Sequence, residues 1–133
     1  MEDYKKSEFS FKERLMSFKY AFSGLKILFS KEHNAHIHLI ITIITIVMGV
    51  LFSISSVEWL VVLVLIALVF SLEIINSAIE HLCNFISPEW HKTIKNIKDL
   101  SAAAVLVAAV MAVICGIIIF IPKLCDFFGH SCN

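Results

Sequence analysis

The chain has few of the residues that build loops, since only four of its 133 residues are glycine and two are proline. The glycines are scattered, so the sequence contains neither a G-x-x-x-x-G-K-[ST] motif nor a glycine-rich kinase loop. It also lacks a C-x-x-C pair or any other strong metal-binding spacing. The absence of both glycine motifs excludes nucleotide sites of the P-loop and protein-kinase types. A nucleotide would have to be held by helices and charged side chains instead.

Charge is missing from three long stretches, because residues 35–54, 59–72 and 101–121 contain no Asp, Glu, Lys or Arg. The second stretch continues to Ile86 as one expected helix. Each segment supplies the ~20 residues needed to cross a bilayer, and the 59% hydrophobic composition exceeds the ~45–50% usual for soluble domains. We therefore expect an all-α integral membrane protein, a single domain over residues 1–133, with three transmembrane helices at about 35–54, 59–86 and 101–121.

Basic residues lie on one side of the expected spans. Of the eleven, seven precede the first span and three lie between the second and third: Lys5, Lys6, Lys12, Arg14, Lys19, Lys26 and Lys31, then Lys92, Lys95 and Lys98. The positive-inside rule then places the N-terminus and the 87–100 loop in the cytoplasm and the C-terminus outward. The expected location is the cytoplasmic (inner) membrane. No cleavable signal peptide is expected, because the first ~30 residues are charged throughout.

An amphipathic helix is predicted before the first span, over about residues 11–30. Ser10 and Glu13 have the spacing of a capping box, which predicts a helix start near Phe11. A narrow apolar stripe then recurs at steps of four and three, formed by Phe11, Leu15, Phe18, Phe22, Leu25 and Phe29. A basic, aromatic-rich helix beside a membrane span is expected to lie flat on the inner leaflet.

The second span carries a polar face inside its apolar sequence. Glu73, Asn76 and Glu80 are three or four residues apart, which places them on one side of a helix. A carboxylate at membrane depth costs about 2.5–3.5 kcal/mol on insertion scales, so this face requires a functional reason. The helix runs from outside to inside, which puts Glu73 in the inner third of the bilayer and Glu80 near the cytoplasmic headgroups.

The connection after this span is predicted to contain Ser87 as a helix N-cap and Pro88 at a first helical position, with Trp90 as an interfacial anchor. The third span carries a stripe of small residues at four-residue spacing, which lets another helix approach closely. Its members are Ala104, Ala108, Ala112 and Gly116. Three helices enclose little space, so we expect oligomerisation.

Four polar features are expected to meet at the cytoplasmic interface: Glu32, the Glu73/Asn76/Glu80 face, the segment 89–91, and the pair Lys98 and Asp99. Lysines can offset phosphate charge, and carboxylates hold Mg²⁺, which prefers hard oxygen ligands and nucleotide phosphates. Phosphoryl transfer requires little beyond positioning, a metal and charge neutralisation. The set of residues therefore suits transfer of a phosphoryl group to a lipid.

The residues resemble a known family. The element Glu73-Ile-Ile-Asn76-Ser-Ala-Ile-Glu80, followed eighteen residues later by Lys98-Asp99-Leu-Ser-Ala-Ala-Ala-Val, is similar to that of the prokaryotic diacylglycerol kinases, which include the undecaprenol kinases. The resemblance covers nearly the whole chain, with Ser17-Phe-Lys-Tyr20-Ala-Phe-Ser-Gly-Leu and Lys31-Glu32-His-Asn upstream. The Glu-His-Asn run and the Lys-Asp-Leu-Ser-Ala ending are closer to the undecaprenol kinase branch.

The resemblance implies a homotrimer in the bacterial cytoplasmic (inner) membrane, whose active sites are shared between subunits. It implies transfer of the γ-phosphate of ATP to the hydroxyl of diacylglycerol or undecaprenol, with Glu73 as general base. Glu32 and Glu80 would hold Mg²⁺, and Asn76 would support the site. Nucleotide contacts would come from both soluble segments: Lys98 and Asp99 on the phosphates, aided by Glu89, Trp90 and His91, with Tyr20 from the surface helix.

Two positions depart from the family pattern. Asn84 stands where many members have Asp, one turn after Glu80, and this bears on metal or nucleotide contacts. His36 stands where a basic residue is common, which would make a contact with lipid phosphate depend on pH.

Two alternatives come from other functional classes. A small proton-coupled transporter would also need a membrane glutamate such as Glu73, whereas a non-catalytic scaffold would leave that residue unexplained. No nucleic-acid partner is expected. On the outward tail, Cys125 and Cys132 could form a disulfide in an oxidising compartment.

Overall fold

The computed structural model describes residues 10–129, and over this range it contains four helices and no strand. The helices are α1 (Phe11–Lys31), α2 (His33–Leu51), α3 (Ser56–Ile86) and α4 (Lys92–Phe127). The last three are long and apolar enough to cross a membrane. The expected all-α fold with three long apolar helices is therefore confirmed.

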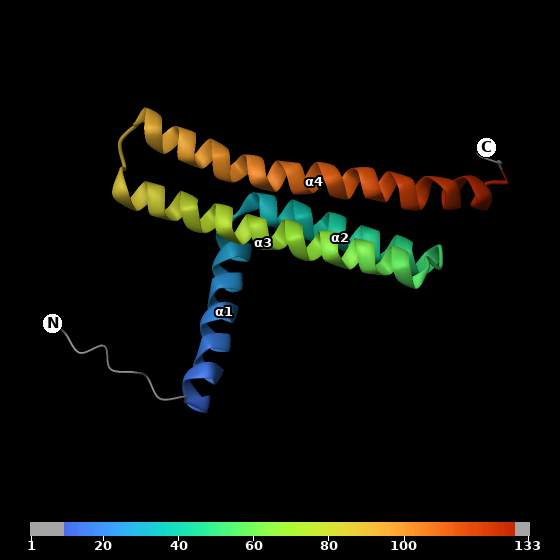
Figure 1. Ribbon diagram of the computed structural model, residues 1–133, viewed down its shortest axis with the longest axis horizontal. Coiled ribbons are helices and arrows are strands. Elements are labelled where there is room, and N and C mark those ends of the chain that lie inside the picture. Colours follow the sequence, from blue (N-terminus) through green and yellow to red (C-terminus); the bar gives the residue numbers. More distant parts are fainter. Residues whose placement is uncertain (1–9, 130–133) are drawn as a thin grey trace.

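Helix α1 begins where the sequence predicts. The Ser10 side chain accepts a hydrogen bond from the backbone N–H of Glu13 at 3.4 Å, which caps the first turn. Figure 1 shows α1 projecting from the side of the bundle that α2, α3 and α4 form together, and α1 meets this bundle at its C-terminal end. Most of its apolar stripe, including Phe11, Phe18 and Phe22, is exposed in the single chain, whereas Phe29 at the end of the stripe packs against Phe70 of α3.

One residue makes the turn between α1 and α2. Glu32 has an extended backbone (φ −102°, ψ 112°), which ends α1 and starts α2. Its side chain makes no hydrogen bond to the start of α2, although it occupies the N-cap position. Because the backbone changes direction here, the Glu32 carboxylate is free to point toward α3 instead.

Helix α3 forms the centre of the bundle, because the backbones of α2 and α4 each lie close to it, while those two helix backbones do not approach each other within the described residues. In Figure 1, α4 runs beside α3 over most of its length, whereas α2 accompanies only the part of α3 nearer the α2–α3 turn. Ala108, a member of the small-residue stripe, is buried (4% exposed) in the face of α4 that meets α3. A small side chain at this position lets the two helix backbones approach closely.

The end of the bundle that contains the α2–α3 turn is closed by apolar side chains, and we call it the apolar end. Its core consists of Ile54 from the turn, Val62 from α3, and Ile119 and Phe120 from α4, and Met48 of α2 packs against this cluster. A Cβ at Gly49 would lie 2.7 Å from the Trp59 ring, so only glycine allows α2 to pack this closely. An ion pair of 3.3 Å between Glu58 and Lys123 also connects the start of α3 to the end of α4.

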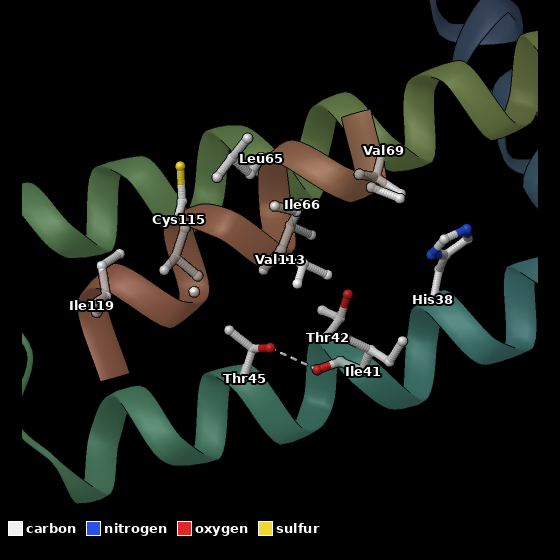
Figure 2. Close-up of a pocket in the computed structure, with 14 residues that line it drawn as sticks. His38, Ile41, Thr42, Thr45, Leu65, Ile66, Val69, Val113, Cys115 and Ile119 are labelled. Atoms are coloured by element: carbon white, nitrogen blue, oxygen red, sulfur yellow. Dashed lines mark hydrogen bonds between the residues drawn. The ribbon is translucent and has the colours of Figure 1, made fainter. Parts of the chain in front are cut away.

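Between this core and the opposite end, a cavity of about 210 Å³ separates α2 from α4 over the surface of α3. Figure 2 shows its lining, in which Thr42, Thr45 and His38 of α2 face apolar side chains of α3 and α4. Thr45 uses its hydroxyl to hydrogen-bond the carbonyl oxygen of Ile41 on its own helix at 2.8 Å. The cavity is therefore largely apolar.

Two predictions about the α3–α4 connection were wrong. Ser87 ends α3 as its C-cap instead of starting the next helix, and Pro88 lies in the short loop that follows. Helix α4 begins at Lys92, where His91 provides the cap by accepting from the N–H of Thr93 at 3.2 Å. Residues 92–100, which belong to the expected cytoplasmic connection between the spans, form the first turns of α4, since Lys side chains do not oppose helix formation.

Candidate functional site at the polar end of the bundle

The opposite end of the bundle carries the chain's converging polar residues, and we call it the polar end. It comprises Glu32, residues 73–91 of α3 and the following loop, and residues 92–102 of α4. Because Glu32 meets α3 at Ser77, the last nine residues of α3 extend roughly 14 Å beyond the α1–α2 corner. In Figure 1 this α3–α4 hairpin projects past α1 and the start of α2.

Glu73 is the most deeply buried large side chain of the described chain, with 2% of its surface exposed. It lies one turn beyond Val69, which lines the apolar cavity. Its electrostatic neighbours are His38, Glu32 and Glu80. The three glutamates that the sequence analysis groups together are therefore near one another in the single chain, and Glu73 is the one farthest from solvent.

Asn76 links α3 to α4 beside Glu73. It is 8% exposed, and its Oδ1 accepts a hydrogen bond of 2.7 Å from the Ser101 hydroxyl. Ser101 also lies 2.9 Å from the carbonyl oxygen of Lys98. A buried amide of this kind needs a partner to offset its desolvation, so Ser101 fixes the orientation of Asn76 next to the buried glutamate.

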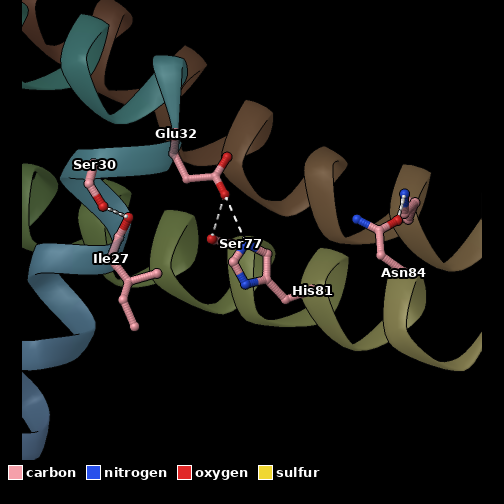
Figure 3. A network of polar contacts seen from close by, with 7 residues as sticks. Ile27, Ser30, Glu32, Ser77, His81 and Asn84 are labelled. Carbon is pink, nitrogen blue, oxygen red and sulfur yellow. Dashed lines mark hydrogen bonds and ion pairs between the residues drawn. The ribbon is translucent and has the colours of Figure 1, made fainter.

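The Glu32 carboxylate is held by two residues of α3, as Figure 3 shows. The Ser77 hydroxyl donates to Oε1 of Glu32 at 2.9 Å, and Nε2 of His81 lies 3.5 Å from the same oxygen. Oε2 takes part in neither contact. The side chain is about one-fifth exposed, so one oxygen is anchored while the other remains available to a ligand. The His36 ring turns back to its own helix, with Nδ1 3.0 Å from the carbonyl oxygen of Glu32.

A larger polar cavity of about 480 Å³ lies between α3, the 87–91 loop and the start of α4. Its lining includes six of the predicted site residues, namely Glu80, Glu89, Trp90, His91, Lys98 and Asp99. They come from three consecutive segments that the α3–α4 hairpin folds together. The cavity thus brings carboxylates, lysines and an aromatic ring to one place.

The two lysines of this cavity have different partners. Nζ of Lys95 forms an ion pair of 2.5 Å with Asp99 on the same helix. Nζ of Lys98 donates a hydrogen bond of 2.7 Å to Oδ1 of Asn84 on α3. The Lys95 charge is therefore offset by a carboxylate, whereas Lys98 is held by a neutral amide.

One predicted site residue lies apart from the others. Tyr20, on α1, is 64% exposed and does not line the polar cavity. Sequence reasoning also missed four contributors: Ser77, His81, Lys95 and Ser101. Ser77 and Ser101 lie inside the quoted motifs, so proximity to Glu73 and Lys98 was their only signal. Lys95 was recognised only as one of the basic residues of the cytoplasmic segment, and His81 carried no signal.

The donor set fits Mg²⁺ arriving with a nucleotide. Within residues 10–129, no three His, Cys, Asp or Glu side chains are arranged to hold a metal by themselves. Mg²⁺ is commonly bound by one or two carboxylates together with substrate phosphates and water, in contrast to metals held in an all-protein cage. Glu80 at the cavity wall and the available oxygen of Glu32 provide such carboxylates.

Comparison with known proteins assigns the family. A model of the prokaryotic diacylglycerol kinase family matches residues 19–120. The chain belongs to this family. It is an enzyme of the lipid kinase class, and it is a membrane protein with three helices suited to spanning.

Individual relatives carry two kinds of name. An undecaprenol kinase of Bacillus subtilis is 38% identical over 81% of this chain and 88% of its own length. A diacylglycerol kinase of Synechocystis is 32% identical over 83% of this chain and 63% of its own length. A diacylglycerol kinase of Escherichia coli is 28% identical over 71% of this chain and 78% of its own length.

Proposed function

We propose that the protein transfers the γ-phosphate of ATP to the hydroxyl of undecaprenol at the cytoplasmic face of the inner membrane. The observation that carries this proposal is the α3 face on which buried Glu73 and Asn76 lead directly to Glu80 in the wall of the polar cavity. The Glu73 end of this face is suited to an apolar lipid that accepts the phosphoryl group, and the Glu80 end is suited to the charged nucleotide that donates it.

Glu73 is proposed as the general base. It would take the proton of the acceptor hydroxyl while the hydroxyl oxygen forms a bond to the γ-phosphorus. The bond from that phosphorus to the β,γ-bridging oxygen breaks, and ADP leaves. Burial of Glu73 keeps bulk water away from the reacting oxygen, and Asn76, held by Ser101, lines the approach. A positioned base of this kind contributes about 10²–10⁴-fold to rate.

Glu32 and Glu80 are proposed to hold Mg²⁺ with the nucleotide. When bound, the ion would neutralise charge on the transferring phosphoryl group. Glu32 is suited to this role because Ser77 and His81 restrain Oε1, leaving Oε2 available. The remaining nucleotide contacts are proposed for the cavity side chains Glu89, Trp90, His91, Lys98 and Asp99.

The acceptor is proposed to be a polyprenol. Identity to the undecaprenol kinase is higher, and covers more of that protein's length, than identity to either diacylglycerol kinase described above. The apolar cavity is also consistent with a long hydrocarbon substrate, because it reaches Val69, one turn from Glu73. A chain lying there would bring its terminal hydroxyl to the buried carboxylate.

The proposed assembly is a homotrimer with α1 on the cytoplasmic leaflet and the C-terminus outside. Support comes from the exposed aromatic stripe of α1 and from the basic residues of the expected cytoplasmic segments. In the single chain Tyr20 is outside the polar cavity, so its proposed contact with nucleotide would be made in a site shared between subunits.

The decisive experiment measures phosphate transfer from labelled Mg·ATP to undecaprenol and, separately, to diacylglycerol in mixed micelles. The purified protein is compared with Glu73→Gln. We expect faster transfer to undecaprenol, lost in the variant. A faster rate with diacylglycerol would overturn the acceptor assignment alone. Absence of transfer to both lipids by assembled protein would overturn the proposed reaction and favour a proton-flux assay of Glu73.

A further inference from the structure

The polar cavity contains one pairing that the proposed reaction does not explain. Nζ of Lys98 is held at 2.7 Å by Oδ1 of Asn84, across the gap between α4 and α3. Figure 3 shows Asn84 on the α3 turn that follows His81. Both residues line the cavity. A contact between two helices, with the lysine only partly exposed, restricts where the ammonium group can lie.

The charge of the two groups matters as much as their distance. The cavity wall contains three carboxylates, Glu80, Glu89 and Asp99, and two lysines. Lys95 is already paired with Asp99. An Asp at position 84 would pair Lys98 as well, and it would add a fourth carboxylate to a cavity proposed to receive a polyanion. An amide holds the ammonium through its oxygen without cancelling its charge.

We propose that Asn84 is a positioning residue for nucleotide binding, which anchors Lys98 while leaving its full charge available to the phosphates. This inference rests on the proposed function, in which Lys98 contacts the nucleotide. Asn84 does not itself need to touch the nucleotide. Its effect is to keep a cation directed into the cavity, where charge-assisted contacts to phosphate are stronger than neutral ones.

The test measures the dissociation constant of a non-hydrolysable ATP analogue, adenylyl imidodiphosphate, for the full-length protein in detergent micelles at fixed Mg²⁺. Asn84→Asp is expected to weaken binding about fivefold, because Lys98 becomes neutralised. Asn84→Ala, which loses the anchor and keeps the charge, is expected to weaken it about twofold. The matched control is Asn96→Asp, which adds the same charge at an exposed α4 position outside the cavity, with no expected change.

A double-mutant cycle separates positioning from a general structural effect. In a Lys98→Met background the anchor has nothing to hold, so adding Asn84→Ala is expected to change the dissociation constant by less than about 1.5-fold. If Asn84→Ala weakens binding equally in both backgrounds, the inference is overturned, because the residue then acts independently of Lys98.

Other outcomes separate this inference from the proposed function. Binding by Asn84→Asp that equals or exceeds that of the unmodified protein would overturn the inference alone, and tighter binding only at high Mg²⁺ would assign position 84 to the metal. Failure of the unmodified, assembled protein to bind the analogue would overturn nucleotide use and this inference together.

Discussion

At the apolar end, side chains of three helices and the α2–α3 turn fill the space between them, whereas at the polar end most contacts are single hydrogen bonds or ion pairs among charged, amide and hydroxyl groups. Phe120 and Val62 are buried in the first region, and Lys98 and Asn84 face a cavity of about 480 Å³ in the second. Close packing resists change in volume, while a polar cavity can exchange its contacts for those of a ligand. The comparison suggests that one end provides stability and the other provides chemistry.

The largest effect should come from the polar end. Glu73→Gln preserves side-chain volume but removes the proposed proton acceptor, so the transfer rate should fall on the order of 10²–10⁴-fold. The stability of the protein should not decrease in an unfolding titration with sodium dodecyl sulfate, monitored through the helix content. The reason is that the neutral Gln side chain places no charge in the buried site. Transfer within twofold of the unmodified enzyme would remove Glu73 from catalysis.

The matching change at the apolar end should act on stability. Phe120→Ala leaves a void among Ile54, Val62 and Ile119, and we expect a loss of about 3 kcal/mol in the free energy of unfolding in the same titration. The Michaelis constant for ATP should be unchanged. As the control, Phe85→Ala removes a ring that is 86% exposed in the single chain at the polar end. Equal losses of unfolding free energy in Phe120→Ala and Phe85→Ala would contradict the inference that the apolar end provides the stability.

A smaller change is expected at the proposed metal site. Glu80→Gln should raise the Mg²⁺ concentration for half-maximal transfer about tenfold, because a charged ligand becomes a neutral one. Glu13→Gln, an exposed position on α1, is the control for loss of one carboxylate. An unaltered Mg²⁺ dependence in Glu80→Gln would show that Glu80 is not a ligand.

The smallest effect should follow removal of the ion pair at the apolar end. Lys123→Gln breaks the 3.3 Å contact with Glu58. The side chains of both residues are more than one-quarter exposed. Such pairs contribute about 0–1 kcal/mol, so unfolding should shift by less than that while transfer activity stays unchanged. A loss as large as that of Phe120→Ala would show that this pair, and not the apolar packing, closes the end.

Local sequence signals predicted much of the fold. Ser10 and Glu13 marked the start of α1, and uncharged runs marked the three long helices. The signals failed between the end of α3 and the start of α4. Ser87 has a side chain typical of an N-cap, but it is the residue at which α3 ends. The third span was bounded at residue 101 because hydropathy marks membrane depth, whereas α4 begins earlier, at Lys92, since helix formation does not stop at the membrane surface.

The sequence predicted which residues form the candidate site, but it did not predict which of them contact one another. Glu73, Asn76 and Glu80 share a helix face, which spacing alone establishes. The contacts of Ser77 with Glu32 and of Lys98 with Asn84 join residues on different helices. Their geometry depends on how closely the helices pack, which is set by positions such as Ala108 far from the site. A single sequence does not encode that distance in any local pattern.

The one-residue corner at Glu32 has a consequence for how the length of this chain can vary. Each residue added to a helix turns everything beyond it by about 100°. An insertion beside Glu32 would therefore swing the aromatic stripe of α1 away from its present side, or move the carboxylate off Ser77, and no loop is present to absorb the shift. Substitutions at this junction adjust chemistry, but an added or deleted residue changes register, so this stretch should conserve its length more strictly than its composition.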